Sequence, residues 1–512
     1  MVKKDPKLGQ ALNKEKVQVS AHEDGTIYLR NSADDPDAPR SWPLWKKYCI
    51  VGLAWSARKK LTPSTDVCVE DQKRLPAEII HAPVAGVEQM QKEFKSSDEI
   101  GTLGLSLFVL GFALGPLLLA PLSEYVGRRP VYLVSWGLFV IFQIPCAVAK
   151  NMATILVCRF IGGFFGSAPL ANTGGVVHDL FARDECGYAV ALYALSSTDG
   201  PPFGNVVSGF IAQQKGWRWL FWFNLILAGT FWVVIFFFLP ETRDTILMMR
   251  KAKRLRKETG NENIFAEHEK ERGSPGHFYK VSLLRPFRFF FTEPITYLTA
   301  LINGFTFGLI FLSNEAFGLV FSAASGNGGH PWTHSGIVNL TFLAFVIGAL
   351  IGFALQPLQE RIYHRGVAQR GKWPEGRWAS SLVGVWLMPI GLFIAAWTSY
   401  AFVPWIGPVI GFTVFGVGFF CIINAILNYV VDSYGHFAAS SLAAVVCIRN
   451  ICGAGAPLFA RQMFVKLDNQ WALFLCAMLS LFMVPVPFYL LYRGERVRYA
   501  SPYCREHFDT DD

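Results

Sequence analysis

Charged residues are scarce in this chain of 512 residues. Asp, Glu, Lys and Arg together make up 17% of the sequence, whereas a soluble domain carries roughly 25%. Hydrophobic residues reach 52%, and they come in long blocks rather than in spaced stripes. Long blocks with few charges are typical of membrane-spanning helices. The composition therefore argues against an ordinary soluble domain and predicts an all-α integral membrane protein.

Sequence patterns for common enzyme and metal chemistry are also missing. The chain has no Gly-x4-Gly-Lys-Ser/Thr phosphate loop, no His/Cys cluster with zinc spacing and no Gly-x-Ser-x-Gly hydrolase turn. Its ten cysteines show no paired spacing, which argues against a disulfide framework. We therefore expect no enzyme, no metal, no cofactor and no ATP-driven step. The net charge of +9 reflects bases beside apolar blocks, so it predicts membrane orientation rather than a nucleic-acid partner.

The apolar blocks predict twelve transmembrane helices. The first block, Tyr48–Ala57, is only about ten residues long, and spanning needs about twenty. A polar stretch follows at residues 58–81, which we interpret as an insert that disrupts helix 1; an unusual extracellular loop after a short helix is the alternative. Helices 2 to 12 are predicted at residues 101–121, 131–149, 154–174, 187–212, 220–239, 294–321, 336–355, 378–397, 403–431, 438–464 and 471–491.

Polar segments divide these helices into two sets of six. Residues 1–47 are rich in charge and proline and predict a disordered tail. An N-terminal bundle at 48–239 is separated from a C-terminal bundle at 293–492 by a basic loop at 240–292, and a tail follows at 493–512. Bases crowd the tails, the central loop and alternate short loops, so both termini are predicted to be cytoplasmic.

The most specific motif is the tight turn between the second and third helices. Glu124 stands three residues before Gly127, and Arg128 and Arg129 follow directly. Glycine permits the sharp turn, and the arginines favour the cytoplasmic side. The motif resembles the signature loop of the major facilitator superfamily, in the form seen in fungal drug:proton antiporters, with Ala120 and Glu124 where the family usually has Gly and Asp. The resemblance implies a substrate site between two six-helix bundles.

Two charged residues inside predicted spans are candidates for proton coupling, because charge inside a membrane is costly and marks functional sites. Arg159 lies in a glycine-rich block that resembles the superfamily's helix 4 motif, in which the arginine is assigned to proton coupling. The alternative is an arginine that snorkels to the interface. Glu315 lies mid-span in Asn314-Glu-Ala-Phe317, which resembles fungal relatives. A proton carrier and a structural carboxyl are its two interpretations.

Predicted helix 5 carries small residues at four-residue steps. The run resembles the antiporter motif at Gly200, Pro201, Gly204 and Gly209. Small residues allow close packing and proline kinks a helix, so the run predicts a hinge that faces helix 8. Asn205 and Ser208 stand where the motif has proline and glycine, which leaves plain helix packing as an equal alternative.

Predicted helices 10 and 11 carry a polar group of residues, Asn424, Asn428, Asp432 and Arg449. The two asparagines are one turn apart on one helix face, so we expect them to line a cavity. Asp432 is expected near the cytoplasmic end, paired with Arg449 or with the next loop, and a gating or packing role is favoured for it.

The resemblance implies a monomeric, multi-pass secondary transporter that exports a small organic molecule in exchange for protons. The cargo would be a secondary metabolite, toxin, drug or organic acid. The expected membrane is the plasma membrane, with the vacuolar membrane as the alternative. Two other functions stay open, namely an importer or uniporter with the same fold and a membrane sensor that binds a ligand without moving it.

Overall fold

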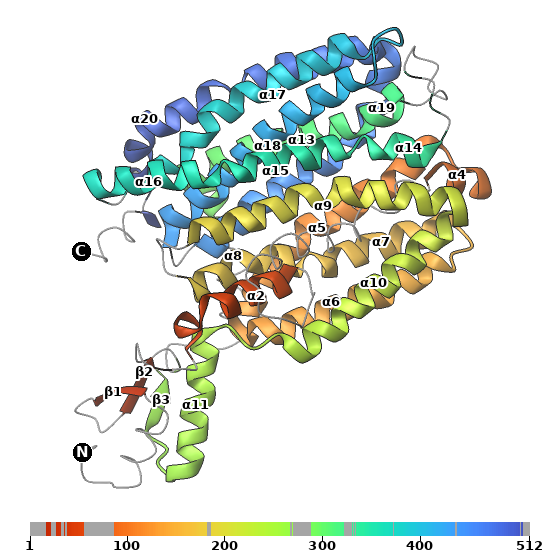
Figure 1. The fold of residues 1–512 in the computed structure, drawn as a ribbon. Coiled ribbons are helices and arrows are strands. Elements are labelled where there is room, and N and C mark those ends of the chain that lie inside the picture. Colours follow the sequence, from red (N-terminus) through yellow and green to blue (C-terminus); the bar gives the residue numbers. More distant parts are fainter. Residues whose placement is uncertain are drawn as a thin grey trace.

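The computed structural model is dominated by long helices that run side by side in one bundle (Figure 1). It describes residues 17–21, 27–31, 35, 38–55, 87–181, 186–266, 269, 288–321, 330, 332, 334–371, 373–435, 438–501 and 503–504. The polar stretch at 58–81, with the disruption of helix 1 expected from it, lies outside these residues.

Eight helices in the described part of the chain are long and apolar enough to cross a membrane. Five of them are single helices, two are composite, and α17 (Ala379–Thr398) is preceded without a break by the short helix η6 (Pro374–Trp378). The single ones are α5 (Asp98–Val126), α6 (Arg128–Ala147), α10 (Trp217–Phe238), α13 (Pro294–Phe321) and α18 (Ile406–Tyr434). The composite ones are α14 (Ser335–Leu340) with α15 (Leu343–Ala354) and α16 (Gln356–Arg370), and α19 (Ala438–Leu481) with α20 (Pro485–Tyr499).

Four further helices occupy the places of predicted helices 1, 4 and 5, namely α2 (Leu44–Trp55), α7 (Met152–Gly166), α8 (Ala168–Leu180) and α9 (Cys186–Lys215). Predicted helix 4 is divided into α7 and α8, because Pro169 lacks a backbone N–H and stands in the first turn of a new helix. The Asn151 side chain caps α7 by accepting a hydrogen bond from the Thr154 N–H at 2.8 Å.

Helices 11 and 12 are joined in α19 without a loop. The break predicted between residues 464 and 471 is a kink at Asp468, which has a φ of 62°. Helix 8 also differs from its prediction, because it is interrupted between α14 and α15 and extends through α16 to Arg370. Length and composition locate such spans well, whereas kinks depend on local backbone geometry.

The two sets of helices pack mainly within themselves and also across a shared interface. In the first set, α7 packs between α5 and α6, and α10 packs on α6; in the second, α18 packs on α17 and α15, and α13 on α19. Across the interface, α5 packs on α19, and α9 packs on α14, α15 and α18. Many large apolar side chains stay exposed on the outside, including Phe237, Val134 and Ile226, as expected for a surface that faces lipid.

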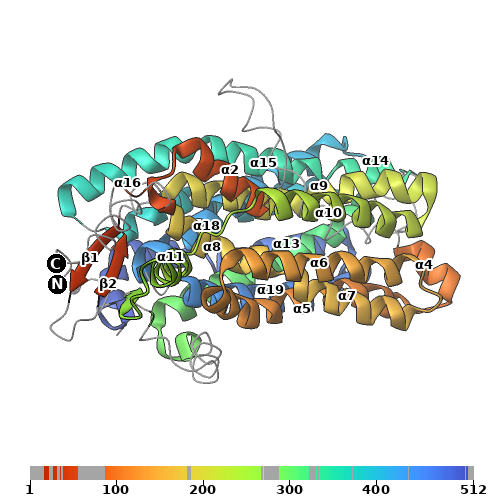
Figure 2. The same ribbon diagram turned by 90° about the horizontal axis from the view of Figure 1, so that it is seen from below.

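A small subdomain lies beyond one end of the bundle, opposite the short helix α4 (Val87–Phe94) (Figure 2). Its sheet pairs β1 (Val17–Ala21) with β2 (Ile27–Asn31) antiparallel, and β2 with β3 (Ile264–Ala266) parallel. Helix α11 (Asp244–Thr259) covers it through Met248, Ala252 and Leu255. Two segments of the predicted tail thus form strands, and the partner strand of β2 lies in the central loop, which the composition of the tail does not reveal.

Candidate gating networks and transport site

The turn between α5 and α6 is held by the carboxylate of Glu241, which lies three residues after the end of α10. Gly127 has a φ of 116°, and a Cβ at this position would lie 2.4 Å from Oε2 of Glu241. Glu241 accepts hydrogen bonds from the backbone N–H groups of Arg128 at 2.8 Å and Arg129 at 3.4 Å. A carboxylate at a helix N-terminus satisfies free N–H groups and is favoured by the helix dipole.

The Arg128 side chain is buried rather than directed to water. Its Nε donates to Oδ2 of Asp179 at 3.3 Å, and its Nη1 donates to the hydroxyl of Ser123 at 2.8 Å. Arg243 donates to the other oxygen of Asp179 at 3.4 Å. The sequence predicted an acid near this turn at Glu124, which acts on Arg128 electrostatically, but among the described contacts the carboxylate bonded to the Arg128 side chain belongs to Asp179. Arg129 differs, because it extends over the surface to the carbonyl of Phe236 at 2.9 Å.

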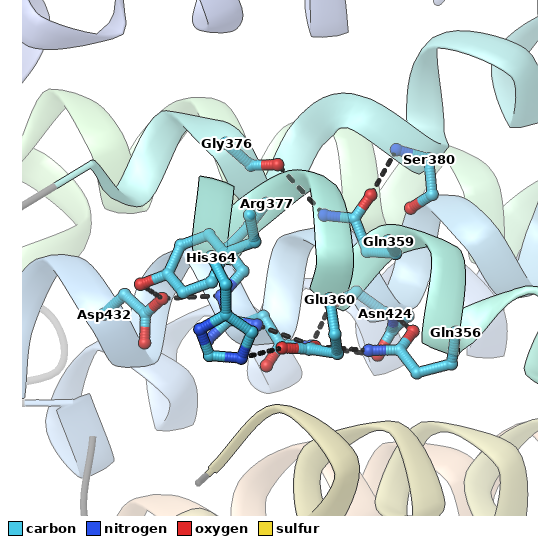
Figure 3. A network of polar contacts seen from close by, with 11 residues as sticks. Gln356, Gln359, Glu360, His364, Gly376, Arg377, Ser380, Asn424 and Asp432 are labelled. Carbon is cyan, nitrogen blue, oxygen red and sulfur yellow. Dashed lines mark hydrogen bonds and ion pairs between the residues drawn. The ribbon is translucent and has the colours of Figure 1, made fainter. Parts of the chain in front are cut away.

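A second buried arginine, Arg377, forms the centre of a larger network in the other set of helices (Figure 3). It lies in the short helix η6 (Pro374–Trp378). Its Nε donates to Oδ2 of Asp432 at 2.7 Å and its Nη1 donates to Oε1 of Glu360 at 2.8 Å. The Tyr363 ring lies 3.6 Å from the guanidinium carbon, and its hydroxyl donates to Asp432 at 3.0 Å.

Amide side chains extend this network along α18. Gln356 donates to Glu360 at 2.7 Å, and Asn424 donates to Gln356 at 2.8 Å. Asn428 donates to the side-chain oxygen of Asn424 at 2.9 Å. The two asparagines expected to line a cavity therefore bond to each other and to the network around Arg377. Among the described contacts, Asp432 bonds to Arg377 in η6, whereas the sequence pointed to Arg449 or the next loop as its partner.

The two networks repeat one arrangement. In each, an arginine near the start of the third helix of a set bonds to an aspartate near the end of the fourth. Nearly the same number of residues separates Arg128 from Arg377 as separates Asp179 from Asp432. Two further acids belong to the first network and are not among the predicted site residues, namely Asp179 at the end of helix 4 and Glu241 directly after Pro240 at the end of helix 6.

The two halves touch at both ends of the bundle. At the end that carries Arg377, a Cβ on Gly187 of α9 would lie 2.2 Å from Oε1 of Glu360. At the other end, the Gln213 side chain accepts from the Gly336 N–H at 3.1 Å and lies 3.2 Å from the His334 ring nitrogen. Helix α9 therefore contacts the second half at both ends.

Helix α9 carries the small-residue run of predicted helix 5. Gly200 and Gly204 are buried, with Pro201 beside them inside the helix. A Cβ on Gly209 would lie 2.9 Å from Cβ of Asn339 in α14. The run faces the second half, where only small side chains permit this spacing. Asn205, one of the departures from the motif, is buried, and its Oδ1 has no hydrogen-bond partner in the described part of the chain.

Comparison with known proteins agrees with this architecture. The family model for the Major Facilitator Superfamily matches residues 77–457. The chain belongs to this superfamily. Two fungal relatives are the efflux pump FUB11 of Gibberella fujikuroi, 36% identical over 85% of this chain and 75% of its own length, and the citrinin biosynthesis cluster transporter mrr1 of Monascus ruber, 35% identical over 93% and 92%. Among solved structures, the proton:xylose symporter XylE covers 88% of this chain and 96% of its own, with 15% identity and a TM-score of 0.57.

The superfamily fold confirms the predicted all-α membrane protein. Two charged residues predicted inside its helices are Arg159 and Glu315. Arg159 is buried in α7, where its Nε donates to the carbonyl of Gly104 in α5 at 2.9 Å. Its guanidinium carbon lies 4.9 Å from the centre of the Phe108 ring. Arg159 is therefore buried within the first set of helices, between α7 and α5.

Glu315 lies closer to one end of its helix than the sequence indicated. Six residues separate it from the end of α13 at Phe321, which is about 9 Å along the axis. Arg461 of α19 acts on it electrostatically. Arg461 also acts electrostatically on Glu99 at the start of α5, so this basic residue attracts acidic residues of both halves.

Proposed function

We propose that this chain is a secondary transporter that exports a small organic molecule in exchange for protons. The observation that carries the proposal is the pair of closing contacts on α9, one at each end of the bundle. Alternating access requires a contact at each end that forms and breaks in turn around a central site. Relatives named as efflux pumps and as transporters of biosynthesis clusters support export of a secondary metabolite.

The buried ion-pair networks would hold one end of the transporter closed. Breaking a buried pair leaves a charge uncompensated, so such networks favour one discrete arrangement over another. Gly187 lies against Glu360, which places the network around Arg377 directly at the boundary between the halves. We infer that this end is cytoplasmic, because the basic central segment and the bases of both predicted cytoplasmic tails flank it.

The remaining features of the proposal follow from this topology. Both termini would be cytoplasmic and the protein would act as a monomer in the plasma membrane. The functional units would be a bundle at 48–239 and a bundle at 293–492, joined by the segment 240–292. Substrate and protons would be the only partners besides lipid, and no chemical conversion would accompany transport.

Proton coupling is assigned to Glu315 and Arg159. Glu315 lies near the predicted extracellular end of α13, where a proton that enters from outside reaches it first. Arg461 would compensate its charge when the proton leaves. The resulting change in attraction between Arg461 and the two acids, Glu315 and Glu99, would bias the outer contacts between the halves.

The test uses a strain that lacks the gene. A compound that accumulates in its cells and is depleted from its medium identifies the cargo, and the wild-type gene restores export. We expect Glu315→Gln to abolish pH-driven export, because its side chain carries no exchangeable charge, while Glu495→Gln on the exposed face of α20 leaves it intact. Both variants must reach the membrane in equal amounts, as judged by immunoblotting.

Three results would count against the proposal. Full export by Glu315→Gln would remove this residue from the coupling mechanism. Export that persists when a protonophore collapses the pH gradient would indicate facilitated diffusion instead of proton exchange. A compound depleted inside rather than outside the cells of the deletion strain would indicate import instead of export.

A further inference from the structure

Five arginines are buried in the described part of the chain, and they differ in how their charge is balanced. Three of them form ion pairs with carboxylates, namely Arg128 with Asp179, Arg377 with Asp432 and Glu360, and Arg498 with Glu375. The other two, Arg159 and Arg449, form no ion pair with any described carboxylate. A buried guanidinium without a counter-charge is costly inside a membrane protein and marks a functional position.

Arg449 is the less satisfied of these two. It is 2% exposed, and it lies eleven residues into α19, which is about 17 Å from the start of the helix. Its Nε makes a long hydrogen bond of 3.3 Å to the side chain of its neighbour Asn450. Its Nη1 is buried and has no partner among the described residues. At least one strong donor is therefore available to a ligand.

Helix α13, which packs against Arg449 through Phe307, carries further polar groups without hydrogen-bond partners in the described chain. The guanidinium carbon lies 4.1 Å from the centre of the Phe307 ring. Asn303 is one turn before Phe307 and shares its face of the helix, and Thr306 is three residues after Asn303 and adjoins it on the helix surface. Both are fully buried, and the Asn303 amide and the Thr306 hydroxyl find no hydrogen-bond partner within the described chain. Buried polar groups are normally satisfied, so these atoms point to a ligand.

The position of Arg449 is also the boundary between the halves. The amide of Asn450 donates to the carbonyl of Phe112 in α5 at 3.2 Å, and Tyr193 of α9 acts electrostatically on Arg449. Phe112 lies 5.3 Å from the ring of Phe108, and Phe307 lies 5.4 Å from the ring of Phe419. An aromatic surface of the second half thus lies against the guanidinium, and α5 of the first half contacts the adjacent residue Asn450, at the place that alternating access opens.

We propose that Arg449 anchors the carboxylate of an organic anion with a planar apolar body. The guanidinium binds a carboxylate through two parallel hydrogen bonds, and the planar body lies along the aromatic surface that begins at Phe307. Asn303 and Thr306 bind neutral oxygen or nitrogen atoms of the same molecule. This assignment rests on the proposed transport function and narrows its substrate to the class of aromatic carboxylic acids.

The test compares three probes that share one ring system and differ in charge: 1-naphthoate, 1-naphthamide and 1-naphthylmethylamine. Full-length protein is purified and reconstituted in liposomes, and both saturable binding and flux driven by a pH gradient are measured for each probe. We expect 1-naphthoate to bind best. Arg449→Gln should weaken its binding by roughly 10- to 100-fold and Arg449→Lys by less, because lysine keeps the charge without the planar pair of donors. Arg361→Gln, on the exposed face of α16, should have no effect.

The two measurements separate this inference from the transport proposal. Binding of naphthoate that Arg449→Gln removes, without flux of any probe, keeps the anion site and overturns transport. Flux of the amide or the amine but not of naphthoate keeps transport and overturns the anion site. Equal binding of naphthoate by wild type and Arg449→Gln, or no binding by wild type, also overturns it. If Arg449→Gln fails to fold, as shown by its melting temperature, the charge preference of the wild type and the Arg449→Lys variant decide the question.

Discussion

Arg377 differs from most arginines of this chain because two carboxylates and a tyrosine ring enclose it. Replacing it by glutamine leaves Asp432 and Glu360 buried without their shared counter-charge. We expect Arg377→Gln to lower the free energy of unfolding by roughly 3–5 kcal/mol, the cost of breaking a buried pair. Melting of the purified protein in detergent measures this, with the exposed Arg361→Gln as the matched control. Equal melting temperatures would show that the network does not stabilise the fold.

Gly127 combines a positive φ of 116° with a carboxylate packed against its Cα. Alanine is therefore unfavourable at this position for two reasons, namely the backbone strain and the clash with Glu241. We expect Gly127→Ala to cost roughly 1–3 kcal/mol of stability and to loosen the cap on α6. Gly260 is a suitable control, because its φ is 69° but no atom lies within 4 Å of a built Cβ. If both alanine variants melt at the same temperature, the contact with Glu241 contributes nothing.

At the scale of elements, α4 is tied to α10 by one carboxylate. Glu93 accepts hydrogen bonds from Arg218 at 2.7 Å and from the Trp217 ring N–H at 2.8 Å. The hydrogen bond from Arg218, followed by that from Trp217, holds the pKa of Glu93 below its usual value of 4.5. Because the pKa is lowered in the folded state, the stabilisation is present above pH 4.5 and is lost as the pH falls through the lowered pKa.

We therefore expect Glu93→Gln to speed amide hydrogen exchange in α4 at neutral pH. Exposed pairs contribute about 0.2–1 kcal/mol, so the increase is at most about fivefold. The difference from wild type should vanish once the pH lies below the pKa of Glu93. Lys92→Gln, on the exposed side of the same helix, serves as the control. A difference that persists below the pH at which Glu93 is seen to protonate would mean that the carboxylate charge is not what holds α4.

The sequence predicted the elements better than the contacts between them. Long apolar blocks located the spans, and the glycine at residue 127 located the turn. The partners of the turn could not be predicted, because Asp179 and Glu241 are brought to Arg128 only when three helices meet. Arg377 was not predicted as a site residue for the same reason. It stands one residue before predicted helix 9, and the carboxylates that it bonds to come from α16 and α18. Local sequence patterns indicate which residues are buried, but they do not indicate which distant residue neutralises a buried charge.

For the whole molecule, alternating access requires that α9 and α14 separate. A built Cβ on Gly209 lies 2.9 Å from Cβ of Asn339, and disulfides join Cβ atoms about 3.5–4.5 Å apart, so a small shift permits a bridge. We expect the double variant Gly209→Cys with Asn339→Cys to lose nearly all flux on oxidation and to recover it with a reducing agent. Flux is measured in reconstituted liposomes, as for the naphthalene probes.

The single variant Gly209→Cys is the control for this experiment, since it has the same added volume without a bridge. Peptide mapping under non-reducing conditions confirms that residues 209 and 339 are joined. Undiminished flux through the fully bridged protein would show that these two helices stay together throughout the transport cycle.

The small sheet beyond the bundle has a consequence for the order of biosynthesis. Strand β2 ends at Asn31, whereas its parallel partner β3 begins at Ile264, so the entire first set of helices is made between them. At a synthesis rate of about 5–20 residues per second, β2 waits roughly 10–50 s for β3. The sheet therefore cannot be completed until the whole first half has been synthesised, and the β2 segment of the tail gains its parallel partner only after that.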